Sequence, residues 1–199
     1  MAEEDKVRWN KKYEDPETAQ SLSEPLQLIQ DYSRLSPGKR ALDIACGLGR
    51  HSKFLADNGF EVDALDISSV AISKLQGTPH ITAKEVDFDS YVLPKEKYDL
   101  IVCAYFLKRS LFMPMIEALT PNGIILMETF LHGPGNERAP SNPAFLLNEG
   151  ELEGVFDDKC ELLHIREYEE RDSQGYKTMK AQMVARKKSG GMSDDDFWA

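Results

Sequence analysis

Two glycines and an aspartate near residue 45 form the pattern with the clearest chemical meaning. The apolar run 40–46 leads into Gly47 and Gly49, and Asp66 ends the next such run. Glycines let a backbone pass close to a ligand, and the helix expected after them offers free N–H groups. A carboxylate at the end of the second strand can accept hydrogen bonds from both hydroxyls of a ribose. Glycines alone would fit an ordinary tight turn and the aspartate a solvent-facing charge, but together they favour a nucleoside site.

The same turn favours one kind of nucleoside over another. A dinucleotide fingerprint needs a third glycine at the sixth position counted from Gly47, and this sequence has Ser52 there. Asp43 would place a carboxylate beside a bound pyrophosphate, which is unfavourable, whereas a positively charged amino group would suit it. S-adenosylmethionine combines an amino acid moiety, an adenosine and a sulfonium cation, so it fits these residues better than a dinucleotide does.

The histidines and cysteines indicate neither a metal site nor a disulfide framework. The four histidines lack metal-ligand spacing with one another or with cysteine: His51, His80, His132 and His164. The three cysteines lie in or beside apolar runs and are expected to be buried, reduced thiols: Cys46, Cys103 and Cys160. We therefore predict no metal ion and a cytoplasmic protein.

Strand-like and helix-like segments alternate along the chain. The expected strands are residues 40–46, 61–66, 81–86, 98–104 and 124–130. The expected helices are residues 50–58, a helix capped by Ser68 or Ser69, 111–119, and 148–156 with Asn148 as its cap. Residues 161–170 and 176–187 alternate like an antiparallel hairpin. This order predicts a three-layer α/β fold with a mostly parallel sheet, whose ligands bind at the carboxyl ends of the strands.

Chain length and charge limit the organisation and the partners. We expect one domain over residues 1–187, with 1–37 as an N-terminal helical cap, 131–147 as a long Gly/Pro-rich loop and 188–199 as a flexible acidic tail. The 24 basic and 34 acidic residues leave a net charge of −10. That charge disfavours nucleic acid and anionic membranes. No apolar run approaches the ~20 residues of a membrane helix, and the polar start does not resemble a secretory signal.

Four segments together resemble the successive motifs of class I S-adenosylmethionine-dependent methyltransferases. They are residues 42–50, 62–67, 86–88 and 98–102, and the resemblance covers residues 38–130. One departure is Ala45, where many members have the first glycine of the turn. Residues 49–75 and 142–156 are most similar to the tellurite-resistance, TehB-like branch. The resemblance implies a Rossmann-like methyltransferase fold with a seven-stranded sheet ending in the antiparallel hairpin.

The resemblance also implies roles for individual residues. Asp43, Ala45 and the backbone from Gly47 to Gly49 would hold the methionine part of the cofactor. Asp66 would take the ribose hydroxyls. Towards the base, Ile67 would flank the adenine, Asp87 would bond its amino group and Phe88 would lie against the ring. Ala104 and Tyr105 would lie beside the reactive methyl group, and a helix carrying Trp9 and Tyr13 would cover the cofactor.

The methyl acceptor is less well defined by the sequence. Glu128 and His132, at and beyond the end of the fifth strand, are the best base candidates, and Tyr105, Phe106 and residues 131–147 should shape the acceptor pocket. No obvious strong base is present, which favours a small nucleophile, and the TehB-like resemblance implies thiols and chalcogen oxyanions first. A protein or RNA methyltransferase and a non-catalytic cofactor-binding scaffold remain alternatives, and the chain could be a monomer or a homodimer.

Overall fold

The computed structural model describes residues 2–16 and 24–189. Their strands form one seven-stranded sheet in the order β3-β2-β1-β4-β5-β7-β6. The strands are β1 (Arg40–Ile44), β2 (Glu61–Asp66), β3 (Ile81–Glu85), β4 (Tyr98–Ala104), β5 (Leu119–Phe130), β6 (Cys160–Arg171) and β7 (Lys177–Lys187). The helices are α1 (Ala2–Glu14), α3 (Gln27–Tyr32), α4 (Arg50–Asp57), α5 (Ser69–Leu75), α6 (Phe112–Ala118) and α7 (Glu151–Phe156). The first five strands are parallel, and β7 is antiparallel to both β5 and β6. The predicted fold class is confirmed.

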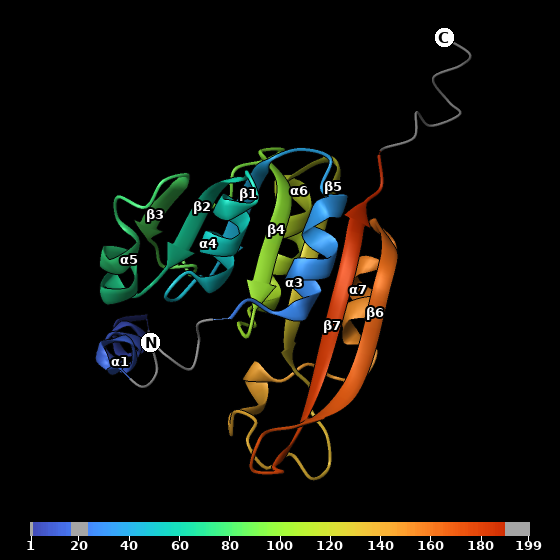
Figure 1. The fold of residues 1–199 in the computed structure, drawn as a ribbon. Helices are drawn as coiled ribbons and strands as arrows, with labels where there is room; N and C mark the ends of the chain where they lie inside the picture. The colour runs from blue at the N-terminus through green and yellow to red at the C-terminus, as the bar shows by residue number, and fades with distance from the viewer. Residues whose placement is uncertain (1, 17–23, 190–199) are drawn as a thin grey trace, which may run out of the picture.

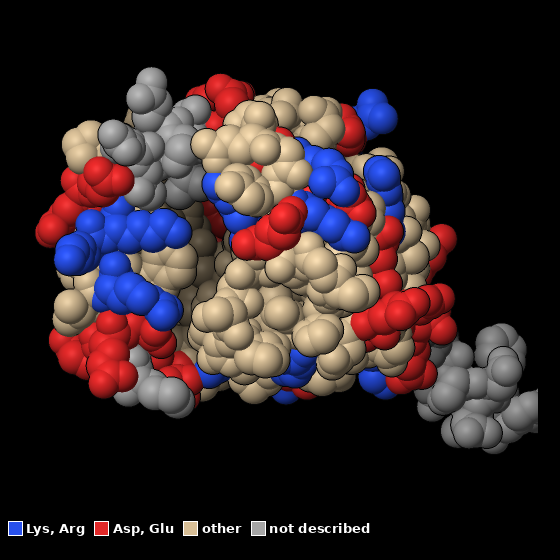
Figure 2. Space-filling view, turned by 90° about the horizontal axis from the view of Figure 1, so that it is seen from below, with Lys and Arg blue, Asp and Glu red and all other residues tan. Residues whose placement is uncertain are grey.

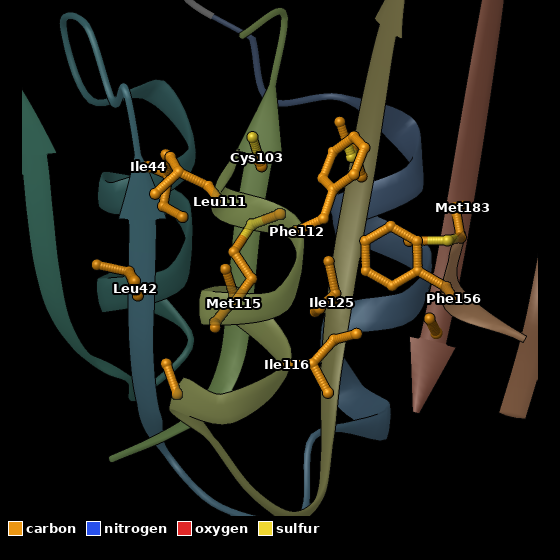
Figure 3. Close-up of a cluster of buried hydrophobic side chains, with 14 of the residues drawn as sticks. Leu42, Ile44, Cys103, Leu111, Phe112, Met115, Ile116, Ile125, Phe156 and Met183 are labelled. Carbon is orange, nitrogen blue, oxygen red and sulfur yellow. The ribbon is translucent and has the colours of Figure 1, made fainter. Parts of the chain in front are cut away.

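Helices cover both faces of the sheet, so the fold has three layers (Figure 1). Apolar residues of α3, α4 and α5 pack on one face. Those of α6 and α7 pack on the other, where Phe112, Met115 and Phe156 meet side chains of the central strands (Figure 3). Strands β1 and β4 are buried on both faces, as nearly continuous apolar runs predict. This packing holds the strand ends, and the residues that follow them, in fixed positions.

The starts of two elements differ most from those predicted. The last parallel strand begins at Leu119 rather than residue 124, because the chain bulges through Pro121–Gly123 before it pairs regularly with β4 from Ile124 onward. The predicted cap Asn148 lies outside α7, which begins at Glu151 after Gly150 in a left-handed conformation (φ 71°).

The N-terminal region contains two helices with different positions. The first, α1, packs against α5 at the carboxyl end of the parallel strands, whereas α3 lies on the sheet face with Leu28 and Ile29 buried (Figure 1). Residues 17–23 of the predicted cap and 190–199 of the predicted acidic tail lie outside the described residues. Within the described ranges, no helix has the length and apolar character needed to cross a membrane.

Strand order determines where a ligand can bind. The connection after β1 turns towards β2, whereas the connection after the neighbouring β4 turns towards β5 on the other side, so a crevice opens between them at the carboxyl ends of these strands. Figure 2 looks at this end of the sheet and shows a hollow flanked on one side by Lys and Arg side chains. The turn after β1 and the residues after β2 and β4 therefore border the same crevice.

Candidate functional site

The turn after β1 is wound through three left-handed residues. They are Ala45 (φ 53°), Gly47 (φ 54°) and Gly49 (φ 76°). Asp66 braces this turn, because its Oδ2 accepts a 2.8 Å hydrogen bond from the Gly47 N–H. The turn and the end of β2 are therefore one unit, as the sequence pattern suggested.

Ala45 adopts a backbone conformation that is unfavourable for alanine. A left-handed conformation costs an L-residue about 1–2 kcal/mol, and glycine is free of that steric cost but loses more chain entropy on folding. We expect Ala45→Gly to raise the free energy of unfolding by up to about 1 kcal/mol, measured by urea denaturation. The control Ala56→Gly, within the right-handed α4, should lower it by about 1 kcal/mol. A loss of stability in both variants would contradict this interpretation of Ala45.

Asp66 is positioned to bind more than the turn. Its side chain is buried, and Oδ1 accepts a second 2.8 Å hydrogen bond, from the Ser68 N–H. Burial raises the pKa of Asp66, and the backbone hydrogen bonds oppose that shift. A carboxylate has about four acceptor positions, so two backbone donors leave room for two hydroxyl groups. The acceptor positions that remain free fit the cis-hydroxyls of a ribose, which would donate to them.

Asp43 is the most deeply buried carboxyl group at the turn. It is 1% exposed, and its Oδ2 accepts a 2.6 Å hydrogen bond from the Ser52 hydroxyl at the start of α4. Burial raises its pKa to about 7, and this upward shift exceeds the opposing effect of the Ser52 hydrogen bond. A ligand ammonium group near Asp43 would favour the ionised form, which is the role that the family resemblance implies.

His51, in the first turn of α4, is a buried base, whereas Asp43 is a buried acid. His51 is 4% exposed. Among the described residues, its Nε2 is the one buried side-chain N or O atom without a hydrogen-bond partner. Burial, and then the charge of Arg50, lower its pKa to about 3. His51 is therefore neutral, and it lies in the helix that follows the glycine turn.

Asp43 and His51 should give opposite slopes to stability against pH. Because the pKa of Asp43 is higher in the folded than in the unfolded state, this group stabilises the fold at pH values below its unfolded-state pKa. That stability is lost as the pH rises towards about 7. Because the pKa of His51 is lower in the folded than in the unfolded state, this group stabilises the fold at pH values above its unfolded-state pKa. That stability is lost as the pH falls towards about 3. Asp43→Asn removes the first term only, so between pH 5 and 6.5 its unfolding free energy should rise with pH by about 1 kcal/mol per unit more than that of the wild type. Parallel pH profiles in urea denaturation would contradict the assignment to Asp43.

A pocket of about 180 Å³ lies where the adenine is expected. Ile67, Val86 and Asp87, at the ends of β2 and β3, line one side, and Glu3 and Lys6 of α1 line the other. Asp87 and Ile67 are thus brought together next to Asp66, the residue predicted to bind the ribose. Phe88 is placed differently, because its buried ring packs with Tyr91 and Phe106 in the hydrophobic cluster. Its contact with an adenine stays a prediction.

Helix α1 closes the crevice on this side. Asn10 Oδ1 accepts hydrogen bonds from the Ser68 hydroxyl (2.6 Å) and from the Val70 N–H (3.3 Å), while Ser68 itself caps α5. Trp9 and Tyr13 stack at 5.5 Å, and a Cβ built on Gly47 would lie 2.7 Å from the Tyr13 hydroxyl. Glycine is therefore needed at residue 47 for the turn and α1 to approach each other.

On the acceptor side, the structure brings the base candidate Glu128 together with Tyr105, which was expected to shape the acceptor pocket. The Tyr105 hydroxyl, after β4, donates a 2.8 Å hydrogen bond to Glu128 Oε1 in β5. The buried ammonium of Lys180 in β7 donates a 2.8 Å bond to the same hydroxyl. His132 is exposed, and no side-chain bond of His132 to this group is seen within the described residues. Sequence patterns missed Lys180, because it looks like one polar residue of an alternating strand.

The loop 131–147 is fastened by tertiary contacts. Arg109 donates to the carbonyls of Ala144 (3.1 Å) and Leu146 (2.9 Å) and pairs with Glu151 at 2.6 Å. Asn136 accepts from the Met179 N–H at 2.7 Å. Any opening of this loop therefore requires that these contacts break.

We expect Arg109→Ala to loosen residues 144–147. Arg109 is partly exposed, so we expect a loss of only about 1 kcal/mol, equivalent to about fivefold faster amide exchange. Hydrogen exchange with mass spectrometry checks this result. The control is Arg138→Ala, at another position of the same loop. It breaks an exposed ion pair with Asp172, which follows β6. Unchanged exchange in residues 144–147 would show that Arg109 does not hold the loop.

Comparisons with known proteins agree with this geometry. A family model described as a methyltransferase domain matches residues 18–170, which is more than half of the chain. A ubiquinone biosynthesis O-methyltransferase from Pasteurella multocida (strain Pm70) is 27% identical over 112 residues, which cover 46% of each chain. The present chain thus spans about half the length of that curated relative.

Solved structures share the fold. The crystal structure of TehB from Haemophilus influenzae matches with a TM-score of 0.69 and 27% identity, over 80% of this chain and 61% of that one. An S-adenosylmethionine-dependent methyltransferase from Methanosarcina mazei matches with a TM-score of 0.64 and 20% identity, over 83% of this chain and 99% of that one. At 20% identity the second match shows the fold alone.

Proposed function

The chain belongs to the methyltransferase-domain family, and from this premise we propose that it transfers a methyl group from S-adenosylmethionine to a small nucleophile. The observation that carries the proposal is Asp66, which joins the glycine turn to the end of β2 and keeps acceptor capacity for two hydroxyls. S-adenosylmethionine supplies a methyl group activated by a sulfonium. The chain's own residues bind it, orient it and exclude water, and positioning supplies much of the acceleration in such displacements.

The residues at the crevice fit this cofactor in three parts. Asp43 lies where an ammonium group would offset the cost of a buried carboxylate, and Asp66 offers oxygen atoms to a ribose. The pocket beside Ile67 and Asp87 offers space and a carboxylate to a base. An aromatic ring near a sulfonium also gains cation–π attraction, and Tyr105 is the aromatic residue that follows β4.

The size of the acceptor is inferred from the loop and the charge. Residues 131–147 follow β5 directly and can cover a compact pocket. Sites for small molecules are enclosed pockets of this kind. The net charge of −10 disfavours RNA, because it opposes the counterion release that drives such binding. Among small nucleophiles, thiols and chalcogen oxyanions rank first, because the resemblance of the sequence to the tellurite-resistance branch implies them.

Methyl incorporation tests the acceptor class directly. The protein is incubated with labelled S-adenosylmethionine and either a panel of thiols, chalcogen oxyanions, amines and carboxylates, or total RNA and protein extract. We expect label in a discrete small product. Label only in an RNA or protein band would replace this proposal with a macromolecular methyltransferase, and cofactor binding without any transfer would favour a scaffold.

A further inference from the structure

A buried polar network lies at the carboxyl ends of β4 and β5, on the sheet face covered by α3 and α4. It joins the Tyr105 hydroxyl to Glu128 and Lys180, and Lys180 also pairs with Glu170 of β6. Glu128 is 5% and Lys180 7% exposed, whereas Glu170 is exposed. Burying charged groups costs desolvation free energy even when they are paired. Apolar residues of similar size often stabilise a fold as well or better. Packing alone therefore gives little reason for this network.

Tyr105 connects the network to the crevice. It is the first residue after β4, opposite the glycine turn, and it holds a left-handed backbone (φ 54°) that bulky residues rarely adopt. The Arg50 guanidinium, from the start of α4, lies 5.7 Å from its ring centroid, and the Phe130 ring lies at 5.2 Å. The strained backbone and these neighbours hold the Tyr105 ring between the start of α4 and Phe130, with its hydroxyl on Glu128.

The hydrogen bonds determine which group holds which proton. Burial, followed by the negative charge of Glu128, raises the pKa of Tyr105, so its hydroxyl stays protonated and donates to that carboxylate. Lys180 has no acceptor capacity and donates to the same oxygen. Tyr168 and Glu170 face the network from β6, and Arg50 faces it from α4. The arrangement is a hydroxyl with a proton acceptor on one side and a cation on the other.

We propose that Tyr105 and Glu128 form a proton relay for the methyl acceptor, with Lys180 as the residue that positions it. This inference rests on the proposed function and narrows its acceptor to a nucleophile that still carries its proton, a hydroxyl or a thiol rather than an oxyanion. The acceptor atom bonds to the methyl carbon as the carbon–sulfur bond breaks and its electron pair stays on sulfur. The acceptor proton passes to Oη of Tyr105 while the Tyr105 proton passes to Glu128, which later releases it to water.

A chromogenic phenol reports the proton position without knowledge of the natural acceptor. The probe is 4-nitrophenol, which is yellow when ionised, added to the full chain with S-adenosylhomocysteine at a pH where it is mostly protonated in water. We expect a saturable yellow shift in the wild type and its loss in Tyr105→Phe and Glu128→Gln. With S-adenosylmethionine, these variants should methylate the probe about 100-fold more slowly, as loss of general-base help predicts.

Lys180 and a matched tyrosine complete the test. Lys180→Met should weaken the shift and move the pH at which it develops, and Lys180→Arg should restore part of it. Tyr98→Phe removes a similar hydroxyl–carboxylate bond, 2.7 Å to Asp63, away from the crevice and should leave the shift intact. No saturable shift in the wild type, or a shift that survives in both relay variants, would overturn the relay. S-adenosylhomocysteine affinity, measured separately by calorimetry, shows whether the proposed function itself has failed.

Discussion

Replacing Asp66 by alanine is expected to weaken cofactor binding and folding together. The affinity for S-adenosylhomocysteine should fall by about 1–3 kcal/mol, because charged hydrogen bonds to the ribose are lost. The Gly47 and Ser68 N–H groups also lose their acceptor, so the free energy of unfolding should fall by about 2–4 kcal/mol. Calorimetric titration and urea denaturation measure the two effects.

The two effects of Asp66→Ala can be separated with a neighbour on the same strand. Asp63 accepts hydrogen bonds from Lys97 and Tyr98, outside the crevice. Asp63→Ala should therefore reduce stability while leaving the cofactor affinity unchanged. Equal affinities for the wild type and Asp66→Ala, under conditions where both are folded, would move the ribose contact to another residue.

Replacing Gly49 by alanine should produce the other large effect. At φ 76° an alanine pays about 1–2 kcal/mol, and its Cβ would lie 2.5 Å from Cδ2 of the fully buried Leu75. Overpacking of this kind costs about 1–3 kcal/mol more. We expect the free energy of unfolding to fall by about 2–5 kcal/mol in urea denaturation.

A second glycine provides the matched control for Gly49→Ala. Gly59 has φ 82°, but a Cβ there would meet nothing within 4 Å. Gly59→Ala should therefore show only the conformational cost, about 1–2 kcal/mol. If the two variants lost the same stability, Leu75 would have moved aside and close packing would not be what requires glycine at residue 49.

Local patterns were sufficient to predict the parallel strands and the residues that follow them. The alternation of apolar segments placed Asp66 and Tyr105 at the correct strand ends, and Ser68 caps α5 as a helix-start signal predicts. These features depend on a few neighbouring residues, so a sequence read in order reveals them.

Features that depend on pairing between distant segments were not predictable in this way. Lys180 reaches Tyr105 because the antiparallel register sets it opposite Phe130, and one polar residue in an alternating strand gives no sign of that. Asn10 bonds to the start of α5 only because α1 docks there. The start of α7 was misplaced because Gly150 rather than Asn148 precedes its first turn.

Cofactor binding tests the central claim most directly. The folded protein is titrated with S-adenosylmethionine or S-adenosylhomocysteine in a calorimeter, and its unfolding is followed with and without either compound. We expect saturable binding at one site and, at about 100 times the dissociation constant, about 2.7 kcal/mol of added stability. No heat of binding and no rise in melting temperature, for a folded sample, would contradict the assignment of this crevice to S-adenosylmethionine.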